Sequence, residues 1–153
     1  MSPKRVLVID DNRMLGTMAE RVLQKAGYEA TVVRDGRDGI RQAQSFAPDL
    51  IILDIVMPGM DGYEVAWALK RNPTTANIPV IFLSGCGNTD ETEGGSARGL
   101  REINQAFEIG ASDFLHKPVA AIELLKSVER ILSFHDFMTP SEKAEKHGND
   151  TGR

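Results

Sequence analysis

The stretch Leu50-Ile51-Ile52-Leu53-Asp54-Ile55-Val56-Met57-Pro58-Gly59-Met60-Asp61-Gly62 decides the fold. Its first four residues are apolar, too few for a helix, and they predict a short strand that is buried on both faces. The strand runs into Asp54. Pro58, Gly59 and Gly62 then supply turn residues, so that a helix can begin near Gly62 or Tyr63. A carboxylate at the carboxyl end of a parallel strand lies where open α/β sheets bind their ligands.

Four further apolar runs and five helix-spaced segments surround this stretch. The runs predict strands at residues 6–9, 28–33, 80–83 and 113–116. Apolar residues recur at helical spacing within residues 14–26, 40–46, 65–69, 100–107 and 122–132. Because parallel neighbours need crossover connections, this alternation predicts a doubly wound α/β fold, with a parallel five-stranded sheet and helices on both faces.

Two segments fall outside this alternation. Residues 85–99 are rich in glycine and acidic residues, and they exceed the usual βα connection of about 2 to 6 residues. We expect them to form a mobile loop. Residues 139–153 are polar and have no apolar periodicity, so we expect a disordered tail. The sequence therefore predicts one domain over residues 1–138, followed by this tail.

Composition narrows the class of protein. The chain has 153 residues, 41% hydrophobic and 26% charged, which are ordinary values for one globular domain, and the formal net charge of -4 gives no reason to expect a nucleic-acid partner. Cys86 is the single cysteine, which excludes an internal disulfide and fits a reducing compartment. No apolar run approaches the length of a membrane span. We expect a cytoplasmic protein that binds neither nucleic acid nor membrane directly.

Polar residues follow four of the five strands at one edge of the predicted sheet: Asp10 and Asp11, Asp54, Ser84 and Lys117. If strands one and three are neighbours, three carboxylates share one crevice, where charges about 4 Å apart repel by roughly 4 kcal/mol at an effective dielectric near 20. This repulsion favours a cation, and oxygen ligands with open positions suit Mg²⁺. Lys117 and Ser84 would face a transferring phosphoryl group, with one carboxylate as its nucleophile. Singly, each residue has a plainer role as a cap, a turn residue or a surface charge; their joint placement is the signal.

These residues also carry a family resemblance. Asp10-Asp11, Asp54 with the Met57-Pro58-Gly59-Met60-Asp61-Gly62 segment, Ser84 and Lys117-Pro118 resemble the receiver domain of two-component response regulators, over residues 5 to about 134. The resemblance implies a flavodoxin-like (βα)5 sheet in the order 2-1-3-4-5 and Asp54 as the phosphoacceptor. It also implies Mg²⁺ or Mn²⁺ held by Asp10, Asp11, Asp54 and the backbone carbonyl of Val56.

The resemblance assigns further roles around the acceptor. Ser84 and Lys117 contact the phosphoryl group, and the Lys117-Pro118 bond is cis, a geometry nearly confined to proline. Phe114 matches the aromatic that rotates inward with the Ser84 hydroxyl on phosphorylation, although an ordinary core aromatic is its plainer interpretation. The chemistry implied is magnesium-dependent self-phosphorylation and autodephosphorylation on Asp54, without an enzyme activity toward another substrate.

Partners follow from the same resemblance. A sensor histidine kinase or a histidine phosphotransfer protein would donate the phosphoryl group. A downstream protein would read the face made by the helix from Leu100 to Ile109, the fifth strand and the last helix, while a homodimer is left open. Gly85 stands where the family usually has alanine, and the 85–99 loop is longer than usual. These departures concern partner choice and switch geometry.

Three other functions use some of the same residue types. A haloacid dehalogenase phosphatase needs a second aspartate two residues after the first, where this chain has Asn12. Nucleotide binding through Gly85-Cys86-Gly87 fails because Asp90 takes the place of the third glycine, and the chain has no Gly-Lys pair for a P-loop. A receiver-like interaction module that takes no phosphoryl group remains the alternative, although every acceptor-site position is filled.

Overall fold

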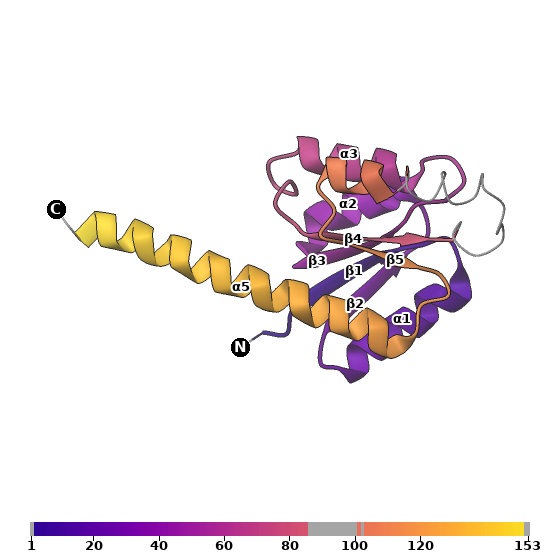
Figure 1. The fold of residues 1–153 in the computed structure, drawn as a ribbon, viewed down its shortest axis with the longest axis horizontal. Helices are drawn as coiled ribbons and strands as arrows, with labels where there is room; N and C mark the ends of the chain where they lie inside the picture. The colour runs from indigo at the N-terminus through magenta and orange to yellow at the C-terminus, as the bar shows by residue number, and fades with distance from the viewer. Residues whose placement is uncertain (1, 86–100, 102, 152–153) are drawn as a thin grey trace.

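One parallel sheet organises the molecule (Figure 1). The computed structural model describes residues 2–85, 101 and 103–151, with side chains described up to Phe137. The sheet has the order β2-β1-β3-β4-β5. This order confirms the doubly wound, flavodoxin-like prediction. The five strands are β1 (Arg5–Ile9), β2 (Glu29–Val33), β3 (Leu50–Asp54), β4 (Val80–Ser84) and β5 (Asp113–His116).

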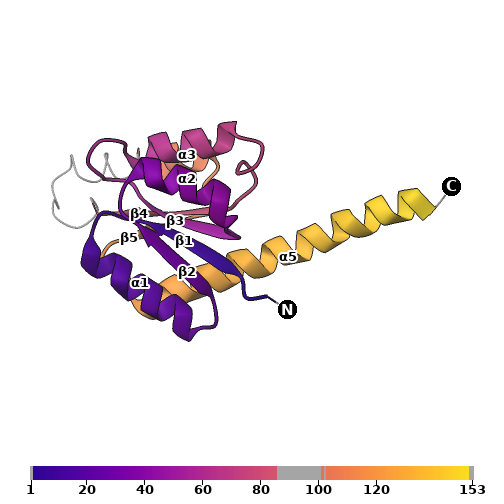
Figure 2. The ribbon, with the colours of Figure 1, turned by 180° about the vertical axis from the view of Figure 1, so that it is seen from behind.

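Helices cover both faces of the sheet. Figures 1 and 2 show α1 and α5 on one side and α2 and α3 on the other. Residues 103–109 form a further helix, whose Ala106 is buried in the same core cluster as the α3 residues. The labelled helices are α1 (Arg13–Lys25), α2 (Gly36–Phe46), α3 (Gly62–Arg71) and α5 (Ala121–Thr151).

The strand residues divide between two apolar layers. In β1, Val6 and Val8 pack toward α1 and α5, whereas Leu7 and Ile9 pack toward α2 and α3. This alternation follows from the period of two along a strand. All five residues of β3 are buried, so the central strand lies between both layers as its apolar run predicts. The sheet is therefore a rigid platform whose carboxyl edge carries the polar residues.

Aspartate and asparagine caps begin three helices directly after the sheet edge. Each cap is in extended conformation and its side chain accepts a hydrogen bond from the backbone N–H three residues later. Such caps satisfy helix donors that have no partner within the helix. They therefore fix where each chain segment turns back over the sheet. The caps are Asn12 for α1, Asp35 for α2 and Asp61 for α3.

The last helix differs from the sequence prediction. Leu124, Val128 and Leu132 of α5 are buried in the core, and the helix then continues to Thr151 beyond the body of the molecule (Figures 1 and 2). Residues 139–151 are thus helical where a disordered tail was expected. Residues 142–146 read Glu-Lys-Ala-Glu-Lys, which are strong helix formers with a glutamate four residues before a lysine. Residues 139–151 also contain Pro140 and Gly148, which disfavour a helix interior, so local helix propensity does not by itself explain the extension.

Two other predicted segments lie only partly within the described residues. The predicted mobile loop at residues 85–99 lies outside the described residues, apart from Gly85. The helix predicted from Leu100 to Ile109 is described as helical over residues 103–109. Within the described part of the chain, none of the helices combines the length and the apolar character that a bilayer crossing requires.

Candidate functional site

The carboxyl edge of the sheet gathers the polar residues that the sequence singles out. Ile9 of β1 is paired with Leu53 of β3, so the residues that follow them, Asp10 and Asp54, reach the edge side by side. Ser84 ends β4 and is paired with His116, the last residue of β5, so that Lys117 follows at the same edge. Strands one and three are therefore neighbours, as the crowding of carboxylates required.

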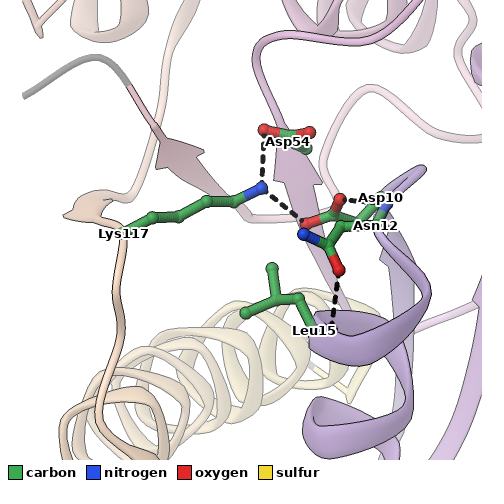
Figure 3. A network of polar contacts seen from close by, with 5 residues as sticks. All are labelled: Asp10, Asn12, Leu15, Asp54 and Lys117. Carbon is green, nitrogen blue, oxygen red and sulfur yellow. Dashed lines mark hydrogen bonds and ion pairs between the residues drawn. The ribbon is translucent and has the colours of Figure 1, made fainter.

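Lys117 bridges the two buried carboxylates. Its Nζ atom lies 3.0 Å from Asp10 Oδ2 and 3.3 Å from Asp54 Oδ1. Figure 3 shows the ammonium reaching from the end of β5 to a position between the two aspartates. Asp10 is fully buried and Asp54 is 2% exposed. Since buried charges are stable only when they are paired, this lysine offsets much of the carboxylate repulsion.

Asp10 is held from two directions. Its backbone N–H donates to the carbonyl of Val33 at 3.0 Å, which extends the β1–β2 pairing by one residue. Its Oδ1 atom accepts a hydrogen bond from the backbone N–H of Asn12 at 2.9 Å, while the Asn12 side chain accepts from Leu15 N at 3.1 Å (Figure 3). The Oδ2 atom is paired with the Lys117 ammonium at 3.0 Å and accepts no other hydrogen bond within the described chain. A buried carboxylate oxygen is thus left available to a cation.

The charged residues of the site shift one another's pKa values. Burial, and then the charge of Asp10, raises the pKa of Asp54 from 3.8 to about 7, against the opposing effect of Lys117. Burial alone would lower the pKa of Lys117, but the hydrogen bonds and charges of Asp10 and Asp54 outweigh it and raise that pKa. Both shifts have the same origin, since two carboxylates and one ammonium leave an excess of negative charge in a poorly solvated pocket.

A divalent cation fits this pocket. Asp10, Asp11 and Asp54 each offer a carboxylate oxygen, and these three atoms lie within 4.8 Å of one another. Asp11 is exposed whereas the other two are buried, so the cluster opens to solvent on one side. Oxygen ligands with room for water suit Mg²⁺ or Mn²⁺. Asp10 Oδ2 is a candidate ligand, because it is buried and accepts no hydrogen bond besides its contact with Lys117.

The loop after Asp54 depends on a glycine that the sequence marks only as a turn residue. A Cβ atom at Gly62 would lie 2.3 Å from the backbone oxygen of Asp54 and 2.7 Å from Ile55 Cα. The Gly62 N–H donates to the carbonyl of Ile55 at 2.8 Å, which closes the loop. Gly59 has a φ of 81°, in the left-handed region that favours glycine. These two glycines let α3 start directly beside the acidic cluster.

The remaining site residues are placed as follows. Ser84 is buried, and its carbonyl accepts a hydrogen bond from the Lys117 backbone N–H at 2.7 Å. The Lys117–Pro118 bond is cis, as the family resemblance implies. Phe114 is partly buried, and its ring meets His116 edge-on at 5.3 Å. The Val56 side chain is 57% exposed and lies two residues beyond Asp54, so only its backbone is a candidate ligand.

Comparison with known proteins decides the family. A model of the response regulator receiver domain matches residues 6–129, which includes all of the site residues described above. The chain belongs to the response regulator receiver family. Among curated proteins, this receiver is 32% identical to the protein PilH of Pseudomonas aeruginosa over 129 residues, which is 84% of this chain and 98% of PilH.

Longer relatives share the domain but not the whole architecture. The receiver is 34% identical to the response regulator PleD of Caulobacter vibrioides over 149 residues, which is 97% of this chain and 30% of PleD. The chain thus spans about a third of that relative. The activity of such longer proteins is therefore not carried over to this receiver.

Solved structures give the same fold. The receiver matches the Vibrio cholerae chemotaxis protein CheY4 with a TM-score of 0.71 and 30% identity, over 84% of this chain and 98% of that one. It also matches the receiver domain of a histidine kinase from Syntrophus aciditrophicus, with a TM-score of 0.70 and 34% identity over 85% and 90% of the two chains. Both comparisons support a five-stranded receiver fold for this chain.

Proposed function

We propose that this receiver takes up a phosphoryl group on Asp54 and releases it again by hydrolysis. The observation that carries the proposal is the convergence of three carboxylates and one ammonium at the sheet edge, with Lys117 bound to both Asp10 and Asp54. An Asp54 oxygen would form the new P–O bond as the bond from phosphorus to its donor breaks. We place the receiver domain at residues 1–138 and infer no other enzyme activity.

Asp10, Asp11, Asp54 and the backbone carbonyl of Val56 would hold the Mg²⁺ or Mn²⁺ ion. The bound ion supplies positive charge for the phosphoryl oxygens and for the carboxylates. Lys117 would keep one phosphoryl oxygen paired, since its ammonium already lies 3.3 Å from Asp54 Oδ1. Neutralising this charge also favours ionised Asp54, which is the form that attacks phosphorus.

Ser84 and Phe114 would change position when Asp54 is phosphorylated. A phosphoryl group adds about -1.5 to -2 charges and new acceptor oxygens. The Ser84 hydroxyl would donate to one of these oxygens, and Phe114 would turn inward into the space that this movement opens. Phe114 is partly buried against the core layer of α3, so its rotation would alter the surface of the neighbouring helix 103–109, β5 and α5.

The partners follow from this chemistry. The donor would be a sensor histidine kinase or a histidine phosphotransfer protein in the cytoplasm, and the product would be read by a protein that binds the face of helix 103–109, β5 and α5. Relatives include transcriptional regulators such as PhoP of Bacillus subtilis, 29% identical, of which the chain spans 53%. For this domain we propose output through protein contact, with a homodimer as one form of it.

Mass spectrometry tests the proposal. Acetyl phosphate with Mg²⁺ should add one phosphoryl mass to the protein, and Asp54→Asn should abolish the addition. Asp38→Asn serves as the matched control, because the half-exposed Asp38 side chain on α2 is paired with Arg41 and lies outside the acidic cluster. An adduct that persists in Asp54→Asn would move the acceptor elsewhere. A wild-type protein that takes no phosphoryl group from acetyl phosphate or from a kinase would favour the receiver-like interaction module.

A further inference from the structure

A hollow lies between α3 and the helix of residues 103–109, on the side of the sheet that holds α2 and α3. Its volume is about 490 Å³. That volume is large enough for one or two apolar side chains of a partner. We call it the α3 groove. Its lining residues are Tyr63, Glu64 and Trp67 from α3 and Gln105, Glu108 and Ile109 from the other helix.

Trp67 is the exposed aromatic wall of the α3 groove. It is the single tryptophan of the chain, and 57% of its surface is accessible. A lone exposed apolar residue is ordinary on a protein surface. Here, however, the indole borders a concavity that Tyr63 and Ile109 also line. Tryptophan is enriched among the residues that contribute most to binding at protein interfaces, and such residues cluster in well-packed pockets.

The charged residues that line the α3 groove are both acidic. Glu64 and Glu108 stand on opposite helices, and none of the six lining residues is a lysine, arginine or histidine. Acidic side chains that flank an apolar hollow complement a partner with lysine or arginine beside an apolar anchor. The space between two helices suits the apolar face of a third. The groove therefore matches an amphipathic basic helix.

The α3 groove is also connected to the proposed switch. The Tyr63 ring lies 5.6 Å from the ring of Phe82 in β4. Phe82 is paired with Phe114 of β5, so their side chains share one face of the sheet. All three rings belong to, or pack against, one core cluster. A change in the Phe114 position thus has a continuous packed route to the groove wall.

We propose that the α3 groove docks a basic amphipathic helix of a partner protein, with Trp67 as its anchor. Docking itself depends on the groove of the unmodified protein. Its regulation through Phe114, Phe82 and Tyr63 rests on the proposed function of Asp54. This surface adjoins the face of helix 103–109, β5 and α5 proposed above. The two share helix 103–109, but the groove extends onto α3 through Trp67 and Glu64 and does not involve β5 or α5.

A designed peptide provides the direct test. The probe is a helical peptide of about 18 residues, with leucines on one face and lysines on the other, and without tryptophan. Its binding should saturate and should move Trp67 emission to shorter wavelength, because the indole leaves water. The matched peptide with glutamate in place of lysine should bind at least about tenfold more weakly. Equal binding of both peptides, or no shift with either, would overturn the proposal.

Variants locate the binding on the surface. Trp67→Gln, followed by anisotropy of a dye-labelled peptide, should weaken binding about tenfold or more. The double variant Glu64→Gln with Glu108→Gln should weaken it and reduce its salt dependence. Phe107→Gln is the control, since Phe107 is an exposed aromatic on the helix of residues 103–109 but does not line the groove. Loss of binding in Phe107→Gln with none in Trp67→Gln would assign the site to the other face.

Two further measurements separate this proposal from the phosphorylation proposal. Trp67→Gln should still take up one phosphoryl mass on Asp54, because Trp67 lies outside the acidic cluster. If the wild-type protein takes up no phosphoryl group on Asp54 but still binds the peptide, the proposed function fails and the docking site stands. A Trp67 shift that depends on protein concentration without peptide would instead assign the groove to a second copy of the chain and overturn the basic-helix proposal.

Discussion

The Lys117 ammonium lies 3.3 Å from Asp54 Oδ1, across the gap between the ends of β5 and β3. β4 lies between these strands in the sheet, and Lys117 spans it to reach both Asp54 and Asp10. The lysine thus ties the Asp54 carboxylate to the strand that carries Phe114. Replacing either Lys117 or Asp54 should therefore change the stability of the protein.

Replacing Lys117 should destabilise the metal-free protein. Lys117→Met keeps the apolar stem but leaves the buried Asp10 and Asp54 carboxylates without their ammonium, which costs about 1.5 to 3 kcal/mol per lost charged hydrogen bond. Proton uptake by Asp54 limits this loss. We expect the free energy of unfolding in urea to fall by about 2 kcal/mol at pH 7. Lys126→Met on α5, outside the site, should change it by less than about 0.5 kcal/mol.

Stability should depend on pH through Asp54. The pKa of this carboxyl is raised in the folded protein from 3.8 to about 7, so the folded state binds more protons than the unfolded chain between these values. The free energy of unfolding of the metal-free protein therefore falls as the pH rises from about 4 to about 7, by at most about 4 kcal/mol. Urea melts at each pH measure this slope.

Asp54→Asn isolates that contribution. The amide cannot ionise, so the variant should lose this part of the pH slope and should be more stable than the wild type above pH 7 without metal. Asp38→Asn, which replaces a half-exposed carboxylate outside the site, should keep the wild-type slope. An unchanged slope in Asp54→Asn would mean that another group carries the dependence.

Magnesium should stabilise the wild type and not the site variants. Binding to the folded state alone adds about 2.7 kcal/mol at a concentration about 100 times the Kd. Asp11→Asn is the informative variant, because Asp11 is exposed and its replacement should leave the apo protein intact while it weakens the metal site. Thermal melts with and without EDTA measure the effect. A magnesium shift that is equal in Asp11→Asn would remove this carboxylate from the ligand set.

The sequence predicts the parallel sheet and the polar residues that converge at its edge, because both depend on local patterns. Short apolar runs that end in polar residues mark β1, β3 and β4, and the shared edge follows from parallel strands. Which of two adjacent acids is buried does not follow from such patterns. Asp10 is buried because its N–H continues the pairing with Val33, whereas Asp11 falls on the exposed side of the next turn.

Two features of the structure cannot be predicted from apolar periodicity. Gly62 is read from the sequence as a turn former, yet its role is to let the chain pass the Asp54 carbonyl, a contact that appears only after β3 and α3 have packed. The length of α5 does not follow from local preference either, because Pro140 and Gly148 lie beside the helix formers of residues 142–146.

The close approach at Gly62 gives the last prediction. In Gly62→Ala the added Cβ would have to lie 2.3 Å from the Asp54 oxygen, and that neighbour is backbone, so the loop between β3 and α3 must shift. We expect a loss of more than about 2 kcal/mol in unfolding free energy and weaker magnesium binding. Gly27→Ala is the matched control. Its φ is 97° and nothing lies within 4 Å of the added Cβ, so it should cost only about 1 kcal/mol of conformational strain and leave magnesium binding unchanged. Equal losses in the two variants would show that conformation, and not the contact with Asp54, makes Gly62 necessary.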